Sequence, residues 1–319
     1  MKVGEKVFEI HLEKVKKLMS SAASEGNPAA FLFANDLRTP AFMLQACARI
    51  FSKIYDSPTL EKLKEDFKLI EDTLGAIDYY TASIKQMEAI LPAHIIAYFS
   101  EKVLEKTALL NTILEENKWL NGEKLNAIEY DLSTVDWEND RKEIKKFYLK
   151  SIEKIEEFVQ ELDFQFTDLE LHVHELRRKL RWLSIYPQAL QGLYVFEEMA
   201  EPVPTYLQKY LTESVLKSPF NVLPTTINFE KLLNLEKGHY LALSWMISEL
   251  GKIKDAGLQI EIVKEAIVHT EKLSQQDAHL QAEKLFNKDT GGHINLRTKA
   301  EEISKTFFQE EILRKILID

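Results

Sequence analysis

The chain has 319 residues, 45% of them hydrophobic, which is enough to bury one large core or two ordinary ones. Only 10 Gly and 9 Pro occur, too few for the many tight turns of a β-sandwich or barrel, whereas helix-forming residues dominate the composition. The formal net charge of −10 excludes general attraction to nucleic acids or anionic membranes, so we expect an all-α globular protein in which any polyanion site is local.

The first half of the chain shows clear helical periodicity. Residues 7–19 predict a helix, and the small and turn-forming residues 20–30 interrupt it. A second helix is predicted from Ala34 to Tyr55, because apolar residues recur there in steps of three and four and line one face. Its apolar face comprises Ala34, Leu37, Ala41, Leu44, Ala48, Phe51 and Tyr55. Further helices are predicted over residues 60–74, 77–91 (separated from the previous one at Gly75) and 94–120.

An apolar seam over roughly five heptads is the strongest periodic signal in the chain. Thr167 and Glu170 have the spacing of a capping box, which predicts that the seam is carried by two helices joined between Asp163 and Thr167. The seam comprises Tyr148, Ile152, Ile155, Val159, Leu162, Phe166, Leu169, Val173, Leu176, Leu180 and Leu183. Beyond the Pro-rich residues 198–208 and 217–229, helical patterns cover residues 229–237, 239–257, 258–287 and 296–317, which makes about ten helices in all.

A polar stripe lies beside this seam. Each residue one position after Val173, Leu176, Leu180 and Leu183 is rotated by about 100° around the helix, to the edge of the buried face. These residues are His174, Arg177, Arg181 and Ser184. Guanidinium groups suit phosphate because their fixed donors engage two oxygens at once, and a histidine among them can donate a hydrogen bond or add charge. The stripe is therefore a candidate site for a chain of phosphates.

An ordinary solvated helix face is the structural alternative. The four cations at Arg177, Arg178, Lys179 and Arg181 lie toward the end of a helix that approaches Pro187, where the macrodipole favours positive charge by about 0.3–1 kcal/mol each. Acidic residues a turn away could also pair with these cations, as is common on helix surfaces.

The chain also contains a faint internal duplication. A shift of 139 residues brings Ala34, Leu37, Ala41 and Leu44 into register with Val173, Leu176, Leu180 and Leu183. On this alignment Arg38 matches Arg177, whereas Asn35 stands at the position of His174 and Phe42 at that of Arg181. The second half has therefore kept the charged stripe that the first half has mostly lost.

This combination resembles the CHAD family, α-helical domains of two halves that each open with a helix of the form H-x-x-R-x-x-x-[KR]. His174, Arg177 and Arg181 match that motif in the second half, and only Arg38 matches it in the first. Residues 70–80, which contain Leu74-Gly75, look like the Leu-Gly segment that usually follows.

The resemblance implies a single domain of two pseudo-symmetric helical bundles, roughly residues 1–160 and 161–319. It also implies a basic central groove that binds inorganic polyphosphate without catalysis. Asn35 and Phe42 would leave one wall of that groove largely uncharged.

The sequence gives little support for a metal site, a phosphate-binding loop or a catalytic nucleophile. Glu236 and His239 have the Glu-x-x-His spacing of di-iron bundles, but Gly238 suits a helix interior poorly and no second such pair occurs, so we expect no metal. Gly291-Gly292-His293 precedes a helical pattern, but the segment lacks the Lys-Ser/Thr of a phosphate-binding loop, so we expect a turn. No serine or cysteine motif marks a nucleophile, and we expect neither an enzyme nor a cofactor.

The location is expected to be cytoplasmic. The N-terminal residues lack the apolar core of a signal peptide, and no run approaches the roughly 20 apolar residues that span a bilayer. Cys47 is the single cysteine, which excludes an internal disulfide and fits a reducing compartment.

We therefore expect a non-enzymatic protein that binds polyphosphate or another phosphate-rich anion in a groove between two helical halves. His174, Arg177 and Arg181 are predicted to make the main contacts. Supporting contacts are predicted for Arg178, Lys179, Arg38 and Arg49. The alternative is a helical scaffold or protein-interaction module, with a protein partner and a vestigial anion site.

Overall fold

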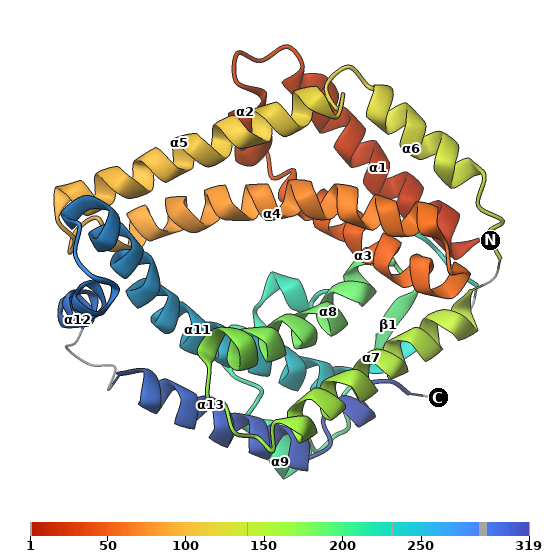
Figure 1. Ribbon diagram of the computed structural model, residues 1–319. Helices are drawn as coiled ribbons and strands as arrows, with labels where there is room; N and C mark the ends of the chain where they lie inside the picture. The colour runs from red at the N-terminus through yellow and green to blue at the C-terminus, as the bar shows by residue number, and fades with distance from the viewer. Residues whose placement is uncertain (1, 139, 231, 287–291, 319) are drawn as a thin grey trace. The chain divides into compact units, whose positions relative to one another are not determined.

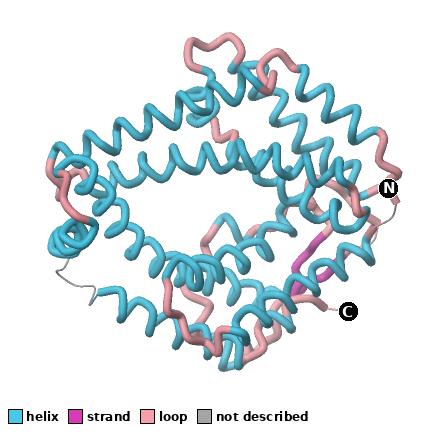
Figure 2. Tube along the Cα trace, in the orientation of Figure 1, coloured by secondary structure: helices cyan, strands magenta, loops and turns pink. Residues whose placement is uncertain are grey.

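Helices make up most of the protein in the computed structural model, which describes residues 2–138, 140–230, 232–286 and 292–318 (Figure 1). This described part is 74% helix and 3% strand, and it contains 13 α-helices, two of which have only four residues (Figure 2). The expected all-α class is confirmed.

The chain forms two compact units. Unit 1 consists of residues 1–140 and 265–275, and unit 2 of residues 141–264 and 276–319. The helix α11 (Lys237–Glu271) therefore contributes its larger part to unit 2 and its last residues to unit 1. The division of the duplicated sequence at residues 160 and 161 stays a prediction, because the units describe contacts and not sequence repeats.

Unit 1 is a helical bundle in which α4 packs against both α3 and α5, and α3 packs against α1 (Figure 1). Its helices are α1 (Val3–Ala22), α2 (Pro28–Ala34), α3 (Arg38–Tyr55), α4 (Pro58–Met87), α5 (Ala93–Glu116) and α6 (Glu123–Ser133). The last residues of α11 join this bundle through Tyr98 of α5, whose hydroxyl donates to Glu265 (2.6 Å) and whose ring lies 4.8 Å from that of His269.

An aromatic cluster holds the start of α1 in unit 1. The rings of Phe8 and Phe51 lie 5.7 Å and 5.4 Å from the ring of Trp137, which is 5% exposed. Gly4, one turn before Phe8, packs directly under Trp137, where a Cβ atom would lie 2.2 Å from Cζ3. The absence of a side chain at this position lets the indole ring lie against the helix backbone.

Unit 2 combines helices with a sheet of two strands (Figure 2). The strands are parallel, and Tyr194 pairs with Leu233. Its helices are α7 (Arg141–Glu161), α8 (Glu175–Ala189), α9 (Thr205–Gln208), α10 (Glu213–Leu216), α11, α12 (Gln275–Phe286) and α13 (Gly292–Gln309). Its strands are β1 (Tyr194–Glu197) and β2 (Leu233–Glu236), and its other helical turns are η1 (Leu169–His174, π-helical), η2 (Pro219–Asn221) and η3 (Leu313–Lys315).

The joint in the apolar seam is confirmed, and the seam is buried except at Leu162 and Leu169 beside the joint, which are half-buried. Val173, Leu176, Leu180 and Leu183 are each 0% exposed, and α7 ends at Glu161, before the π-helical turn begins. The predicted cap is wrong by one residue, because Asp168 and not Thr167 caps the turn. Its Oδ1 accepts from the backbone N–H groups of Glu170 (2.8 Å) and Leu171 (2.7 Å).

Two predicted helix boundaries are also wrong. Ala34 ends α2 and is exposed, and α3 begins only at Arg38, which places Pro40 in the first turn where proline is tolerated. Within the stretch predicted as a helix over residues 229–237, Leu233–Glu236 instead form a strand that pairs with β1. A short apolar run of four to eight residues can form a buried strand or part of a buried helix, and periodicity alone does not distinguish the two.

The two helix breaks predicted at glycines do not occur. The helix α4 continues through Gly75, and α11 continues through Gly257. At Gly75 an added Cβ would lie 2.8 Å from Nη2 of Arg38, and at Gly257 it would lie 2.8 Å from Cδ1 of Leu169. Both glycines therefore serve close approach between helices, which compensates for their weak helix propensity.

Replacing Gly4 by alanine is expected to lower the free energy of unfolding by about 1–3 kcal/mol, because the added Cβ overlaps the buried Trp137 ring. On helix propensity alone the same change would raise it by up to about 1 kcal/mol. Urea denaturation followed by tryptophan fluorescence measures the difference. Gly26→Ala, where no atom lies within 4 Å of the added Cβ, is the control, and a Gly4→Ala protein as stable as this control would contradict the packing.

Candidate anion-binding site

The predicted polar stripe lies on the helix that runs from η1 into α8. His174 is the last residue of the π-helical turn, a conformation that is frequent at functional sites. His174, Arg177, Arg181 and Ser184 are all half-buried, as a stripe at the edge of the buried seam predicts. The seam therefore fixes the backbone beneath the candidate ligands.

Arg177 packs against the backbone of α11. A Cβ atom on Gly251 would lie 3.0 Å from its Nε, so the guanidinium occupies the space of the missing side chain. Its Nε donates to the carbonyl oxygen of Ile247 at 3.3 Å, one helical turn before Gly251. We call this arrangement, a guanidinium lying over a helical glycine, the arginine–glycine contact.

Arg177 has weak electrostatic compensation for its burial. Burial lowers the pKa of Arg177 from its usual value, and the charge of Asp255 acts in the opposite direction. Among the residues that the structure describes, no carboxylate forms an ion pair with Arg177. Asp255 itself pairs with Lys254 at 3.0 Å. The guanidinium is thus partly removed from water without an anionic partner in contact.

The neighbouring basic residues of the helix have acidic partners. His174 Nδ1 lies 2.7 Å from Glu170 Oε1, one turn earlier. Arg178 and Lys179 both pair with Glu175, at 2.6 Å and 3.3 Å, and the Arg178 side chain is 62% exposed. For Arg178 the structure matches the alternative of a solvated helix face with an ion pair one turn apart, whereas Lys179 is half-buried and its Nζ lies 5.0 Å from the centre of the Phe158 ring.

Arg181 and Arg49 complete the predicted set. Arg181 is half-buried on α8, one turn after Arg177, and its backbone carbonyl accepts a hydrogen bond from the Ser184 hydroxyl at 2.8 Å. Arg49 is exposed on α3 in unit 1. The stripe of unit 2 thus brings His174, Arg177 and Arg181 onto one edge of one helix.

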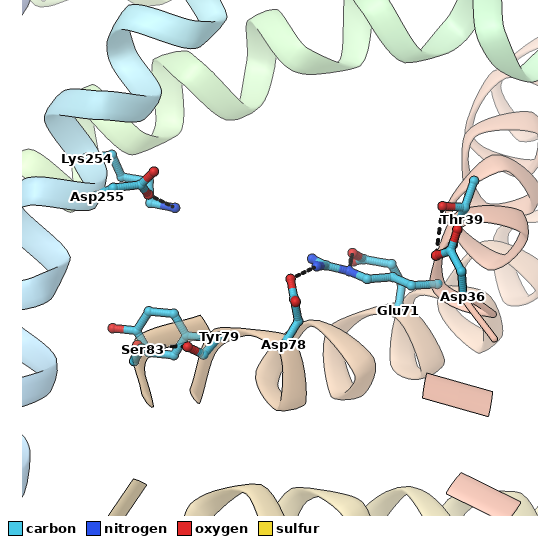
Figure 3. A network of polar contacts seen from close by, with 9 residues as sticks. Asp36, Thr39, Glu71, Asp78, Tyr79, Ser83, Lys254 and Asp255 are labelled. Carbon is cyan, nitrogen blue, oxygen red and sulfur yellow. Dashed lines mark hydrogen bonds and ion pairs between the residues drawn. The ribbon is translucent and has the colours of Figure 1, made fainter. Parts of the chain in front are cut away.

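Arg38 makes a second arginine–glycine contact, within unit 1. Its guanidinium lies over Gly75 of α4, where an added Cβ would be 2.8 Å from Nη2. Here two carboxylates of α4 neutralise the cation (Figure 3): Nε donates to Glu71 and Nη1 to Asp78, each at 2.9 Å. Arg38 and Arg177 therefore share a packing arrangement and differ in their electrostatic partners.

The residues around the two glycines explain this difference. Four positions before the glycine stands Glu71 in unit 1 and Ile247 in unit 2, and three positions after it stands Asp78 in unit 1 and Lys254 in unit 2. The contacts of Arg38 with Gly75 and of Arg177 with Gly251 are not among the features predicted from the sequence. The available signal was the repeated Leu-Gly dipeptide at residues 74–75 and 250–251, which needs a shift of 176 residues and not the 139 that aligns Arg38 with Arg177.

Glu236 and His239 form a helix cap. Glu236 Oε2 accepts from the backbone N–H of His239 at 2.6 Å and also contacts the His239 ring nitrogen Nδ1, while Nε2 of that ring lies 2.9 Å from the Tyr206 hydroxyl. Burial raises the pKa of Glu236, but hydrogen bonds from the ring and backbone of His239 outweigh it, and the pKa is lowered overall.

No metal centre emerges from the part of the chain that the structure describes, since nowhere in it do three or more His, Cys, Asp or Glu side chains gather in a geometry that could hold an ion. The segment Gly291–His293 falls outside the residues whose placement and side chains are described. Within the described ranges no helix combines the length and the apolar character needed to cross a bilayer.

Comparisons of the chain with protein-family models, with curated proteins and with solved structures find no match. The site is therefore interpreted from its own geometry.

Replacing Arg177 or Arg38 with methionine should have different effects on the free energy of unfolding. Arg177→Met is expected to leave the free energy of unfolding unchanged or to raise it by about 1 kcal/mol, because it removes a desolvated charge that lacks a contacting counterion. Arg38→Met is expected to lower it by about 1–3 kcal/mol, because Glu71, 8% exposed, loses its cation. Urea denaturation of both variants tests this, and equal losses of stability would contradict it.

Glu236→Gln is expected to lower the free energy of unfolding by about 1–2 kcal/mol at neutral pH. A carboxyl group with a depressed folded pKa contributes stability above its unfolded pKa and loses it as the pH falls through the folded value. The difference between parent and variant should therefore shrink as the pH is lowered from about 5 toward 3. Urea denaturation at several pH values measures it, and a constant difference over that range would refute the assignment.

Proposed function

We propose that the protein binds inorganic polyphosphate or another phosphate-rich anion on α8 of unit 2, without catalysing a reaction. The observation that carries this proposal is Arg177, a half-buried guanidinium held over Gly251 by one carbonyl oxygen and lacking a contacting carboxylate among the described residues. A charge in this environment gains more from an added anion than a solvated surface arginine does, because the local dielectric is lower.

The spacing of the stripe supports a ligand with several phosphates. His174, Arg177 and Arg181 follow one another at intervals of three and four residues, so they are about 5 Å apart along the helix axis. All three are half-buried, which limits the screening of their charges by solvent. A row of donors at this interval suits a linear anion better than a single phosphate.

We also propose that the two units are related halves of one domain of the CHAD type. Both units contain an arginine that lies over a glycine of a later helix, Arg38 over Gly75 and Arg177 over Gly251, which supports two related halves of the CHAD type. A cytoplasmic location is part of the same proposal, and the fully buried Cys47 is compatible with it.

A helical scaffold is the second candidate. Four of the seven predicted ligand residues already have a carboxylate partner within the protein, namely Arg38, His174, Arg178 and Lys179. Unit 2 also exposes apolar side chains at Phe220 (81%) and Val222 (68%). In this function the stripe would be vestigial and a protein would be the partner.

Binding of polyphosphate separates the two candidates. The parent protein is expected to bind, with an affinity that falls as salt is raised, and Arg177→Ala with Arg181→Ala is expected to weaken binding by about tenfold or more. Isothermal titration calorimetry at two salt concentrations measures both effects. Arg178→Ala, which removes an exposed cation already paired with Glu175, is the control. A double variant that binds like the control would favour the scaffold.

A further inference from the structure

The two arginine–glycine contacts are alike in geometry. In unit 1 the ideal Cβ of Gly75 would meet Nη2, Cζ and Nε of Arg38 at 2.8, 3.3 and 3.6 Å. In unit 2 the ideal Cβ of Gly251 would meet Nε, Nη2 and Cζ of Arg177 at 3.0, 3.5 and 3.7 Å. In both cases the same three guanidinium atoms lie over the glycine, so the position of the cation relative to its helix is comparable.

The residues that flank the two glycines carry different charges. Around Arg38, Glu71 and Asp78 contribute two negative charges, both in hydrogen-bond contact with the guanidinium. Around Arg177, the corresponding positions carry Ile247, which has no charge, and Lys254, which is positive. The formal charge of these two positions is therefore −2 in unit 1 and +1 in unit 2, a difference of three charge units.

The two carboxylates of unit 1 differ in their environment. The Glu71 side chain is 10% exposed, whereas that of Asp78 is 54% exposed. A buried carboxylate interacts more strongly with a guanidinium than an exposed one does, because water screens the exposed pair. Glu71 therefore supplies the larger part of the neutralisation of Arg38.

We infer that Glu71 and Asp78 take the place of an external anion on Arg38, and that the residue four positions before the glycine decides whether each arginine is open to phosphate. This inference rests on the proposed function and specifies its selectivity. An external phosphate must compete with two carboxylates held at high effective concentration by α4. At Arg177 the same position holds Ile247, so an incoming phosphate displaces no carboxylate.

Removing the two carboxylates should open unit 1 to anions. Glu71→Gln with Asp78→Asn keeps the size of both side chains and leaves the guanidinium of Arg38 without its anionic partners. Titration calorimetry with tripolyphosphate at low salt is expected to show one site per chain for the parent and two for this variant. Circular dichroism verifies that the helices are retained.

The matched control removes the same two charges elsewhere on α4. Glu65→Gln with Asp72→Asn eliminates an exposed glutamate and an exposed aspartate that pair with Lys64 and Lys68. This control is expected to bind tripolyphosphate at one site, like the parent. A second site in the control as well would assign the effect to net charge and overturn the inference.

The reciprocal change should close unit 2. Ile247→Glu places a carboxylate four positions before Gly251, as Glu71 stands before Gly75, and it is expected to weaken tripolyphosphate binding by about tenfold or more. Ser248→Glu adds the same charge one residue later, at an exposed position of α11, and is its control. Equal affinities of the two variants would overturn the inference.

These variants also distinguish the inference from the proposed function. If the parent does not bind but the variant lacking the Glu71 and Asp78 carboxylates does, the proposed site in unit 2 and the rule for Arg177 are wrong, and only the inference about Arg38 stands. If the parent binds at Arg177 and the opened variant gains no second site, the proposed function stands and the inference falls. If no variant binds tripolyphosphate, both are wrong.

Discussion

The arginine–glycine contact is the constraint on which both the packing and the proposed chemistry depend. A glycine inside a long helix weakens that helix, yet α4 and α11 each keep one where a guanidinium lies against the backbone. Glycine is needed at both positions, because an added Cβ on Gly75 would lie 2.8 Å from Nη2 of Arg38 and one on Gly251 would lie 3.0 Å from Nε of Arg177. The contact also removes part of the cation from water, which makes the choice of counterion matter for stability and for binding.

Burial determines which basic residues can contribute to recognition. Arg178 is exposed and paired with Glu175 on its own helix, so water and a local carboxylate both screen it. Arg177 lies one residue earlier in the same RRK run, yet it faces α11 and has no such partner among the described residues. In a chain with a net charge of −10, the position of a local anion site therefore depends on which cations the fold keeps away from both solvent and carboxylates.

The sequence predicts the helical class and the buried seam well, because a period of three to four residues is a local property. Val173, Leu176, Leu180 and Leu183 are all buried, as their spacing indicates. Glycine is typical of helix ends, so the sequence predicts helix breaks at Gly75 and Gly257, and only the tertiary structure shows what lies against these two residues. The hydrogen-bond partners of Arg38 and Arg177 lie 33 and 70 residues away in the sequence, so helical periodicity does not reveal them, and the repeated Leu-Gly dipeptide is the signal that points to them.

The proposed function gives the two contacts different roles, one stabilising the fold and the other binding an anion. In unit 1 the carboxylates of Glu71 and Asp78 satisfy the guanidinium, so the contact strengthens the fold and has little to offer a ligand. In unit 2 the cation is held by a carbonyl oxygen, which positions it without neutralising it. A weakly compensated, half-buried charge is costly for folding, and binding of an anion would offset this cost. The proposed anion site therefore rests on Arg177, a positioned arginine that no carboxylate of the described residues contacts.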